Sequence, residues 1–403
     1  MRHPLPPAEP PPGDGPVPVV DFQIAHGGPF YELQRRVGLL HDQALASGRR
    51  AIVAVALAWG VPLVLSALAG HAVGPYQDRP FLADLGAWAR FVIGIAIFFA
   101  MERMVEERLR HLHRRMVDAA ILAPRARADA AQAAIRALQR RNSALAEAVC
   151  CVLAFAISAV AALGIDADSP QWLAQPDGTG FHLTPAGWWC LLVSNPLFLF
   201  LILRWSWRHL VWGLLLRDIA GLDLRLVASH PDGVGGLAFV GDYPKAFAAF
   251  VFALSCAVAA PLAYGVLRGG IELKVWSQVM AIWLVLVALA FAFPLAAFVS
   301  PLGRLRSETL AAASALATRR ERAVERDVLG HNIMATQDAE PSAAADIADP
   351  AKCFAAAGKL RTFPLRKATL LPVGIAALLP LVAVGATQLP IRELLKIARG
   401  LLL

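Results

Sequence analysis

The residues best placed to do chemistry lie in one loop, residues 217–245, where His230 and Asp232 stand two positions apart. A carboxylate beside an imidazole can fix its tautomer, so the pair could act as acid and base. Three glycines follow, and glycine lets backbone N–H groups converge on an anion; they are Gly233, Gly235 and Gly236. The competing interpretation is a structural turn in which Asp-Gly supplies the turn chemistry and His230 caps a helix end. One His and one Asp are too few ligands to predict a metal site.

Arginine and tryptophan alternate just before this loop, after the uncharged block 186–203. Tryptophan belts and snorkelling arginines are typical of a membrane–water interface, so Arg204 and Arg208 are interpreted first as anchors. The functional alternative is that Arg204, Arg208 and Arg225 bind a lipid phosphate. With His230 and Asp232 as acid and base, the region would then be an enzyme site for a lipid or lipid-linked phosphate.

A third candidate site lies inside the fourth apolar block, at Ser194, Asn195 and Pro196. Proline at this position is predicted to break the helix and to free backbone carbonyls within the bilayer. The centres of the apolar blocks contain no Asp, Glu, Lys or Arg, which argues against a proton-driven pump. The leading hypothesis is therefore an oligomeric channel or passive transport protein with these three residues on its path. The alternatives are the interface enzyme and a scaffold that docks a cytosolic protein partner.

These candidates are positioned by membrane helices. The chain has 403 residues, of which 57% are hydrophobic and 17% charged, whereas a soluble protein carries roughly 25% charged residues. The apolar residues form blocks of about 20, the length that crosses a bilayer. We predict an all-α, polytopic integral membrane protein with about seven transmembrane helices and a cytosolic helical layer, the spans being 51–73, 84–101, 146–164, 185–204, 246–267, 275–302 and 368–388.

Basic residues give the orientation. Five Lys or Arg precede the first span, ten lie in 102–145 and eleven in 303–367, but none lies in 165–184. Positive charge stays on the cytosolic side, so the N-terminus is predicted to be cytosolic. The same clustering explains the net charge of +8 without nucleic acid binding. An odd number of spans places the C-terminus outside, which fits the basic C-terminal tail poorly; an interfacial helix or a re-entrant last span would resolve this.

The predicted organisation follows from these spans. It comprises a disordered Pro-rich tail (1–27), a cytosolic amphipathic helix (28–50), spans one and two (51–101), a cytosolic helical hairpin broken at Pro124 (102–145), spans three to six with the loop (146–302), a cytosolic helix and acidic linker (303–367), and span seven with an amphipathic C-terminal helix (368–403).

Two further groups of residues are interpreted as structural and not as parts of a functional site. The five cysteines show no metal-ligand spacing and are interpreted as small apolar residues. The carboxylates at Glu102, Glu106 and Glu107 alternate with arginines, which predicts an ion-paired helix surface. No cofactor is predicted, and the expected partners are the lipid bilayer and further copies of the chain.

Three stretches together carry a family resemblance: 222–227 running into His230-Pro231-Asp232 and Gly235-Gly236-Leu237, Gly27-Gly28-Pro29 with 33–36, and 389–396. On these residues the chain resembles a widespread family of uncharacterised bacterial multi-span inner-membrane proteins. The resemblance covers most of the length and implies a multi-pass location in the bacterial inner membrane. It implies no activity and no catalytic residue.

Overall fold

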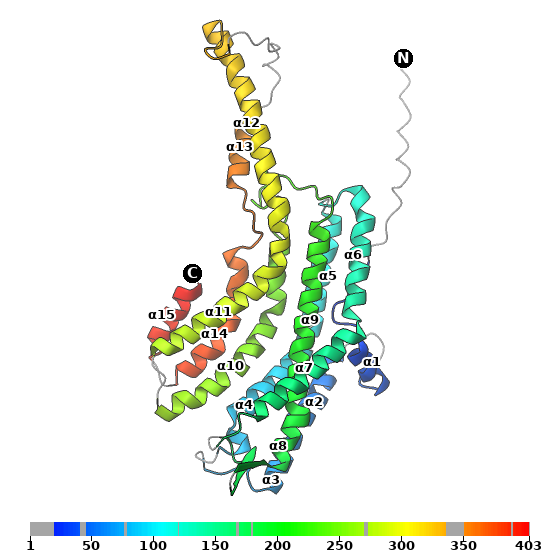
Figure 1. Ribbon diagram of the computed structural model, residues 1–403, viewed down its shortest axis with the longest axis vertical. Helices are drawn as coiled ribbons and strands as arrows, with labels where there is room; N and C mark the ends of the chain where they lie inside the picture. Colours follow the sequence, from blue (N-terminus) through cyan, green and yellow to red (C-terminus); the bar gives the residue numbers. More distant parts are fainter. Residues whose placement is uncertain are drawn as a thin grey trace.

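The computed structural model describes residues 20–40, 46–75, 79–119, 121–166, 169–178, 180–269, 273–335, 350–387 and 390–402. Most of the predicted Pro-rich tail and the acidic linker at 338–349 lie outside these ranges. The described part is helical almost throughout (Figure 1), apart from one hairpin of β1 (Ala174–Asp177) and β2 (Gly180–Leu183), in which Ala174 pairs with Leu183.

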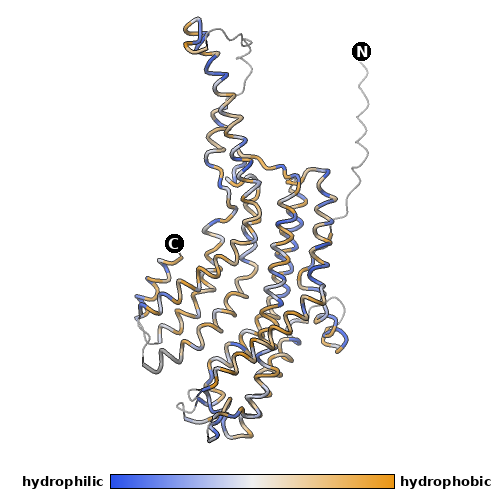
Figure 2. The backbone as a smooth tube through the Cα atoms, viewed as in Figure 1, coloured by the Kyte–Doolittle hydropathy of each residue, from blue (hydrophilic) through white to orange (hydrophobic). Residues whose placement is uncertain are grey.

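Among the described residues, seven helical stretches are long and apolar enough to cross a membrane, which confirms the predicted all-α polytopic fold. Apolar residues line the lower helices, and polar residues gather toward their upper ends and in the lower loops (Figure 2). The stretches are Ser47–Leu68, Leu85–Asp118, Ala144–Ala162, Pro185–Ala220, Val240–Ala263, Lys274–Leu329 and Ala368–Gly385.

Several spans continue beyond their apolar part as charged helices. The second becomes α5 (Ile95–Asp118), the fourth becomes α9 (Asn195–Ala220), and α11 (Leu273–Leu295) leads into α12 (Val299–Leu329). The predicted hairpin is present, because a turn at Pro124–Ala126 separates α5 from α6 (Arg127–Arg141). The antiparallel arm of α12 and α13 (Pro350–Lys359) projects beyond the rest of the molecule (Figure 1). These helices form the predicted helical layer.

The remaining helices complete the bundle. Within the second and fourth spans, α4 and α8 are joined to α5 and α9 by π-helical turns, Trp88–Gly94 and Cys190–Ser194, and η7 (Val240–Phe247) is a 3-10 helix that leads into α10. The remaining α-helices are α1 (Pro29–Arg36), α2 (Ser47–Val55), α3 (Val61–Leu68), α4 (Leu85–Ala87), α7 (Ala144–Ala162), α8 (Pro185–Trp189), α10 (Ala248–Gly269), α14 (Lys367–Gly385) and α15 (Ile391–Leu402).

The predicted break at Asn195-Pro196 is wrong. The fourth span stays helical from Pro185 to Ala220, and Pro196 lies in the first turn of α9 directly after the π-helical turn. A π turn has a wider hydrogen-bonding ring, which accommodates the missing N–H of proline without ending the helix.

The N-terminal segment 20–30, which we call the strap, packs into the bundle instead of forming part of a disordered tail. Phe22 and Ile24 are fully buried, and Phe22 lies against Trp212 of α9 with ring centroids 5.7 Å apart. The sequence-based boundary at residue 27 therefore cuts through a packed segment. The reason is that Phe22, Ile24 and Ala25 bury apolar surface against helices distant in sequence.

Candidate functional site

The loop after α9 begins with a short extended stretch. Side chains at 222–226 alternate as predicted, with Leu222, Leu224 and Leu226 turned inward and the intervening Asp223 and Arg225 exposed. Leu224 forms an antiparallel bridge with Leu122, in the connection after α5. This pairing fixes the start of the loop to the end of α5.

Asp232 organises the glycine-rich part of the loop. Its Oδ1 accepts hydrogen bonds from the N–H groups of Val234 (2.9 Å) and Gly236 (3.1 Å), and its Oδ2 accepts one from Ala238 (3.0 Å). Gly233, Gly235 and Gly236 adopt positive φ values of 70°, 67° and 100°, which non-glycine residues rarely adopt. The glycines therefore form the predicted nest of N–H groups, and the side chain of Asp232 is the anion within it.

The electrostatics of Asp232 follow from these contacts. Partial burial raises the pKa of Asp232, but the three backbone N–H donors and His230 outweigh burial and bring the pKa below its ordinary value of 3.8. His230 Nδ1 lies 2.9 Å from Asp232 Oδ1. Asp232 is thus an ionised, hydrogen-bonded carboxylate that orients the exposed imidazole ring of His230.

The connection between α13 and α14 holds the loop from its other side. Arg366 Nη2 and Arg361 Nη2 both donate to the backbone oxygen of Asp232, at 3.2 and 3.4 Å. The Arg361 N–H donates to the Gly233 carbonyl at 3.0 Å. A Cβ at Gly241 would collide with the Pro364 carbonyl, so glycine is required for this close approach. The loop is therefore fixed by α5 on one side and by the start of α14 on the other.

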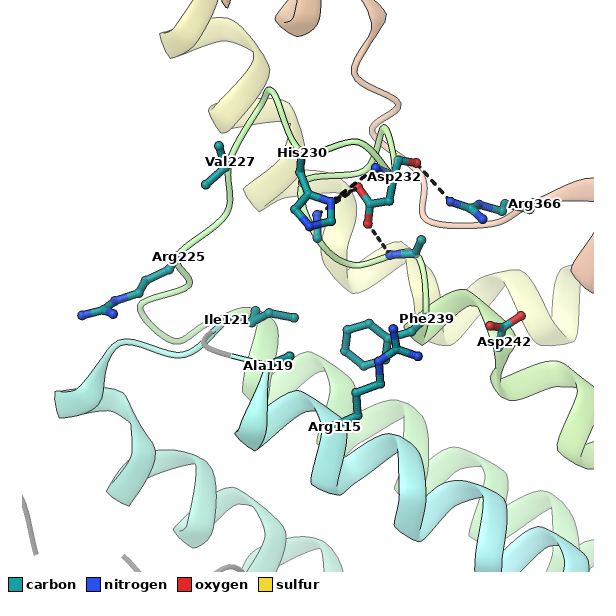
Figure 3. Close-up of a pocket in the computed structure, with 13 residues that line it drawn as sticks. Arg115, Ala119, Ile121, Arg225, Val227, His230, Asp232, Phe239, Asp242 and Arg366 are labelled. Carbon is teal, nitrogen blue, oxygen red and sulfur yellow. Dashed lines mark hydrogen bonds and ion pairs between the residues drawn. The ribbon is translucent and has the colours of Figure 1, made fainter. Parts of the chain in front are cut away.

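A cavity of 390 Å³, which we call the loop pocket, lies under this loop. Figure 3 shows Arg115 extending from α5 toward the loop and Arg366 beside Asp232, to which it is hydrogen-bonded. Arg225 lies at the rim and points outward. Arg115 lies over the ring of Phe239, 4.6 Å from its centroid. Among the described residues no carboxylate lies within ion-pair distance of Arg115, Arg225 or Arg366. Three arginines and two carboxylates therefore line the pocket: Asp232 is held by backbone donors, and Asp242 is paired with Lys245.

The loop pocket contains five of the predicted site residues, namely His230, Asp232, Arg225, Gly235 and Gly236. Sequence reasoning did not identify Arg115, Asp242 and Arg366, which come from three other parts of the chain. Their positions next to spans were the available signal in the sequence: Arg366 lies two residues before the seventh span, and Asp242 lies in the first turn of the fifth. Asp242 is paired with Lys245 at 2.7 Å.

Arg204 and Arg208 do not line the loop pocket. Arg204 is 2% exposed and its Nε donates to Glu147 Oε1 at 2.8 Å, while its Nη2 donates to the Gly27 carbonyl at 3.2 Å. Arg208 is also 2% exposed and donates to the Ala25 carbonyl at 2.6 Å. Both arginines are interior residues, so the interpretation as snorkelling anchors is wrong.

The two arginines belong to a buried group of charges closed by the strap, which we call the strap network. Glu147 Oε2 accepts the N–H of Phe30 at 2.6 Å, and Glu106 accepts the N–H of Ala25. Glu102 and Arg50 form a buried ion pair. The predicted ion-paired surface is thus right for Glu107, which pairs with Arg103 in solvent, and wrong for Glu102 and Glu106.

The predicted channel residues lie in the fourth span, away from both arginine clusters. Ser194 and Pro196 are buried, and Asn195 Oδ1 accepts a hydrogen bond from Arg90 at 3.2 Å. Asn195 and Arg90 line a cavity of 170 Å³. The transport path and the oligomeric state stay predictions.

Comparison of the chain with protein families, with curated proteins and with solved structures gave no match. The family resemblance drawn from the sequence therefore stays a prediction. Within the described residues, no group of three or more His, Cys, Asp or Glu is arranged to hold a metal ion.

Proposed function

We propose that this multi-pass membrane protein binds a phosphate-bearing anion in the loop pocket, and that the ligand is a lipid or lipid-linked phosphate. The observation that carries the proposal is the set of guanidinium groups, Arg115, Arg366 and Arg225, around one cavity without carboxylate partners among the described residues. Guanidinium groups match phosphate oxygens in geometry and keep their charge at any physiological pH. A cavity of this size falls in the range of small-ligand sites, roughly 300–1,000 Å³.

The position of the pocket supports a lipid ligand. Arg366 lies two residues before the candidate span Ala368–Gly385, and Asp242 lies at the start of Val240–Ala263. The ends of spans are where lipid headgroups sit, and basic pockets between helices at that depth bind phosphorylated headgroups. The positive-inside distribution of Lys and Arg supports a cytosolic location for this end.

Lipid binding to the purified protein tests the proposal. In lipid nanodiscs, native mass spectrometry is expected to detect retained phosphatidic acid in preference to phosphatidylcholine. Arg115→Gln is expected to weaken retention about 10- to 100-fold, because a hydrogen bond to a charged group contributes about 1.5–3 kcal/mol. Arg225→Gln should have a smaller effect, since Arg225 lies at the rim.

Arg103→Gln is the matched control, because Arg103 is an exposed arginine of α5 that pairs with Glu107 outside the pocket. Inorganic phosphate and glycerol phosphate serve as competitors. Displacement of the lipid by either would identify a free phosphate site, whereas no displacement supports recognition of the whole lipid. Equal retention by the Arg115 and Arg103 variants would contradict the proposal.

A second candidate function is hydrolysis of the same phosphate ester, and one contact favours it. His230 Nδ1 lies 2.9 Å from Asp232 Oδ1 and 3.3 Å from the backbone nitrogen of Asp232. In the tautomer with its proton on Nδ1, held by the carboxylate, Nε2 can accept a proton. In such a step water attacks phosphorus, the P–O ester bond breaks, and an alcohol and inorganic phosphate are released. Release of phosphate from phosphatidic acid by the wild-type protein, lost in His230→Gln with lipid retention unchanged, would support hydrolysis over binding alone.

A further inference from the structure

The C-terminal helix α15 folds back along the last span. Leu394 packs beside Gly385 and Trp276, and a Cβ at Gly374 would collide with the side chain of Leu402. Figure 1 shows α15 beside α11 and α14. Because a helix rises 1.5 Å per residue, the contact at Gly374 lies about 16 Å from the end of α14, in a hydrocarbon core of about 30 Å. The helix α15 therefore runs from one membrane surface to about the middle of the bilayer.

One face of α15 is cationic and points away from the protein. Leu394 and Ala398 are buried against α11 and α14. Arg392, Lys396 and Arg399 are exposed, and their spacing of four and three residues places them on one face. At 100° per residue this face lies opposite the buried one. No described carboxylate lies within ion-pair distance of the three cations.

The depth of Arg399 excludes simple snorkelling as an explanation for the whole face. Arg392 lies in the first turn of α15, beside the Gly385 end of the span. Arg399 lies about 11 Å farther along the helix, about two turns deeper. Ionisable residues at such depth face the interior of a bundle or a water-filled space, and this face points away from its own bundle.

We propose that the cationic face of α15 lines a water-filled vestibule, open at the Gly385 end of α14, that concentrates small inorganic anions. The occupant follows from the charges, because three cations without carboxylate partners require water and counter-ions. The site lies near Gly385, at the opposite end of the α14 span from Arg366, so it is independent of the loop pocket.

Thiol labelling of the full chain in lipid nanodiscs tests the vestibule. Lys396→Cys and Arg399→Cys are each treated with a negatively charged methanethiosulfonate and with a positively charged one, both unable to enter lipid. Peptide mass spectrometry reports each position separately, so the native cysteines remain. Cys151 is an internal control, since it is exposed on α7 about 11 Å from Ala144, a depth close to that of Arg399.

Both introduced cysteines are expected to react at least 10-fold faster than Cys151, and faster with the negative reagent. Replacing the other two cations by Gln should abolish that preference for charge. Reaction of Arg399→Cys no faster than Cys151 would show that the face contacts lipid and would overturn the proposal. Equal rates with the two reagents would overturn the anion preference. Labelling rates are compared only for variants that elute like the wild-type protein. If Arg399→Cys misfolds, the labelling rate of Lys396→Cys tests the proposal independently.

Discussion

The strap network and the loop pocket contain the same kind of side chain in opposite situations. Arg204 in the strap network is enclosed and bound by Glu147 and by the Gly27 carbonyl. Arg115 in the loop pocket is exposed, lies on Phe239 and borders a cavity. Arginines at the ends of membrane helices therefore cannot be assigned one role as a class. Their partners decide whether they hold the fold together or remain available to a ligand.

The carboxylates differ between the two regions in the same way. Glu147 accepts hydrogen bonds from Arg204 and from the Phe30 N–H, so it joins α7, α9 and the strap. Asp232 is held by N–H groups of its own loop. The strap network thus links segments distant in sequence, whereas the loop holds its carboxylate with local N–H groups, and the arginines around it have no carboxylate partner among the described residues.

The largest effect is expected from breaking the strap network. Arg204→Ala should lower the free energy of unfolding by about 3–5 kcal/mol, because it leaves Glu147 buried without its partner. Thermal unfolding in detergent micelles measures the loss. The control is Arg103→Ala in the exposed pair with Glu107, where no measurable change is expected. Adding Glu147→Gln should restore part of the stability, and equal melting temperatures for both arginine variants would show that burial does not distinguish the two pairs.

A smaller effect is expected at the strap itself, from Gly28→Ala. Gly28 has φ +93°, and a Cβ there would collide with the carboxylate of Glu147. Strain of this kind costs about 1–3 kcal/mol. Gly38→Ala is the matched control, since Gly38 also has positive φ (+75°) but an added Cβ meets no atom within 4 Å. The difference between the two melting temperatures isolates the contact with Glu147, and a Gly38 variant that loses as much as the Gly28 variant would contradict it.

The smallest effect is expected in the loop pocket, as a dependence of local stability on pH. The pKa of Asp232 is lower in the folded loop than its ordinary 3.8, so its contribution is present above that pH and is lost as the pH falls through the lowered pKa. Hydrogen exchange at Val234, Gly236 and Ala238, corrected for the intrinsic rate, should therefore stay slow at pH 5–7 and accelerate below about pH 3.8. Asp232→Asn should exchange faster at pH 7 and lose this dependence. Unchanged exchange in the variant would mean that the carboxylate does not hold the loop.

Much of the fold could be predicted because its causes are local. Apolar blocks of span length, the proline at residue 124 and the alternation at 222–226 each act within a few residues, and the structure confirms all three. Where prediction failed, a local pattern gave one partner of a residue and missed its burial. Glu106 has Arg110 one turn away, which predicts a surface pair, and the structure shows that pair. It also buries Glu106 against the strap, through a contact with Ala25 that sequence spacing does not reveal.

The candidate site also combines features that local sequence sets with features that tertiary packing sets. Seven membrane spans and a glycine-rich loop able to form an N–H nest follow from the sequence alone, because hydropathy and backbone freedom belong to each residue. Three features depend on long-range packing: Asp232 fills the nest, Arg115 and Arg366 border the cavity, and Arg204 and Arg208 are enclosed. A charged side chain takes its role from what surrounds it, and packing brings those surroundings from distant parts of the chain.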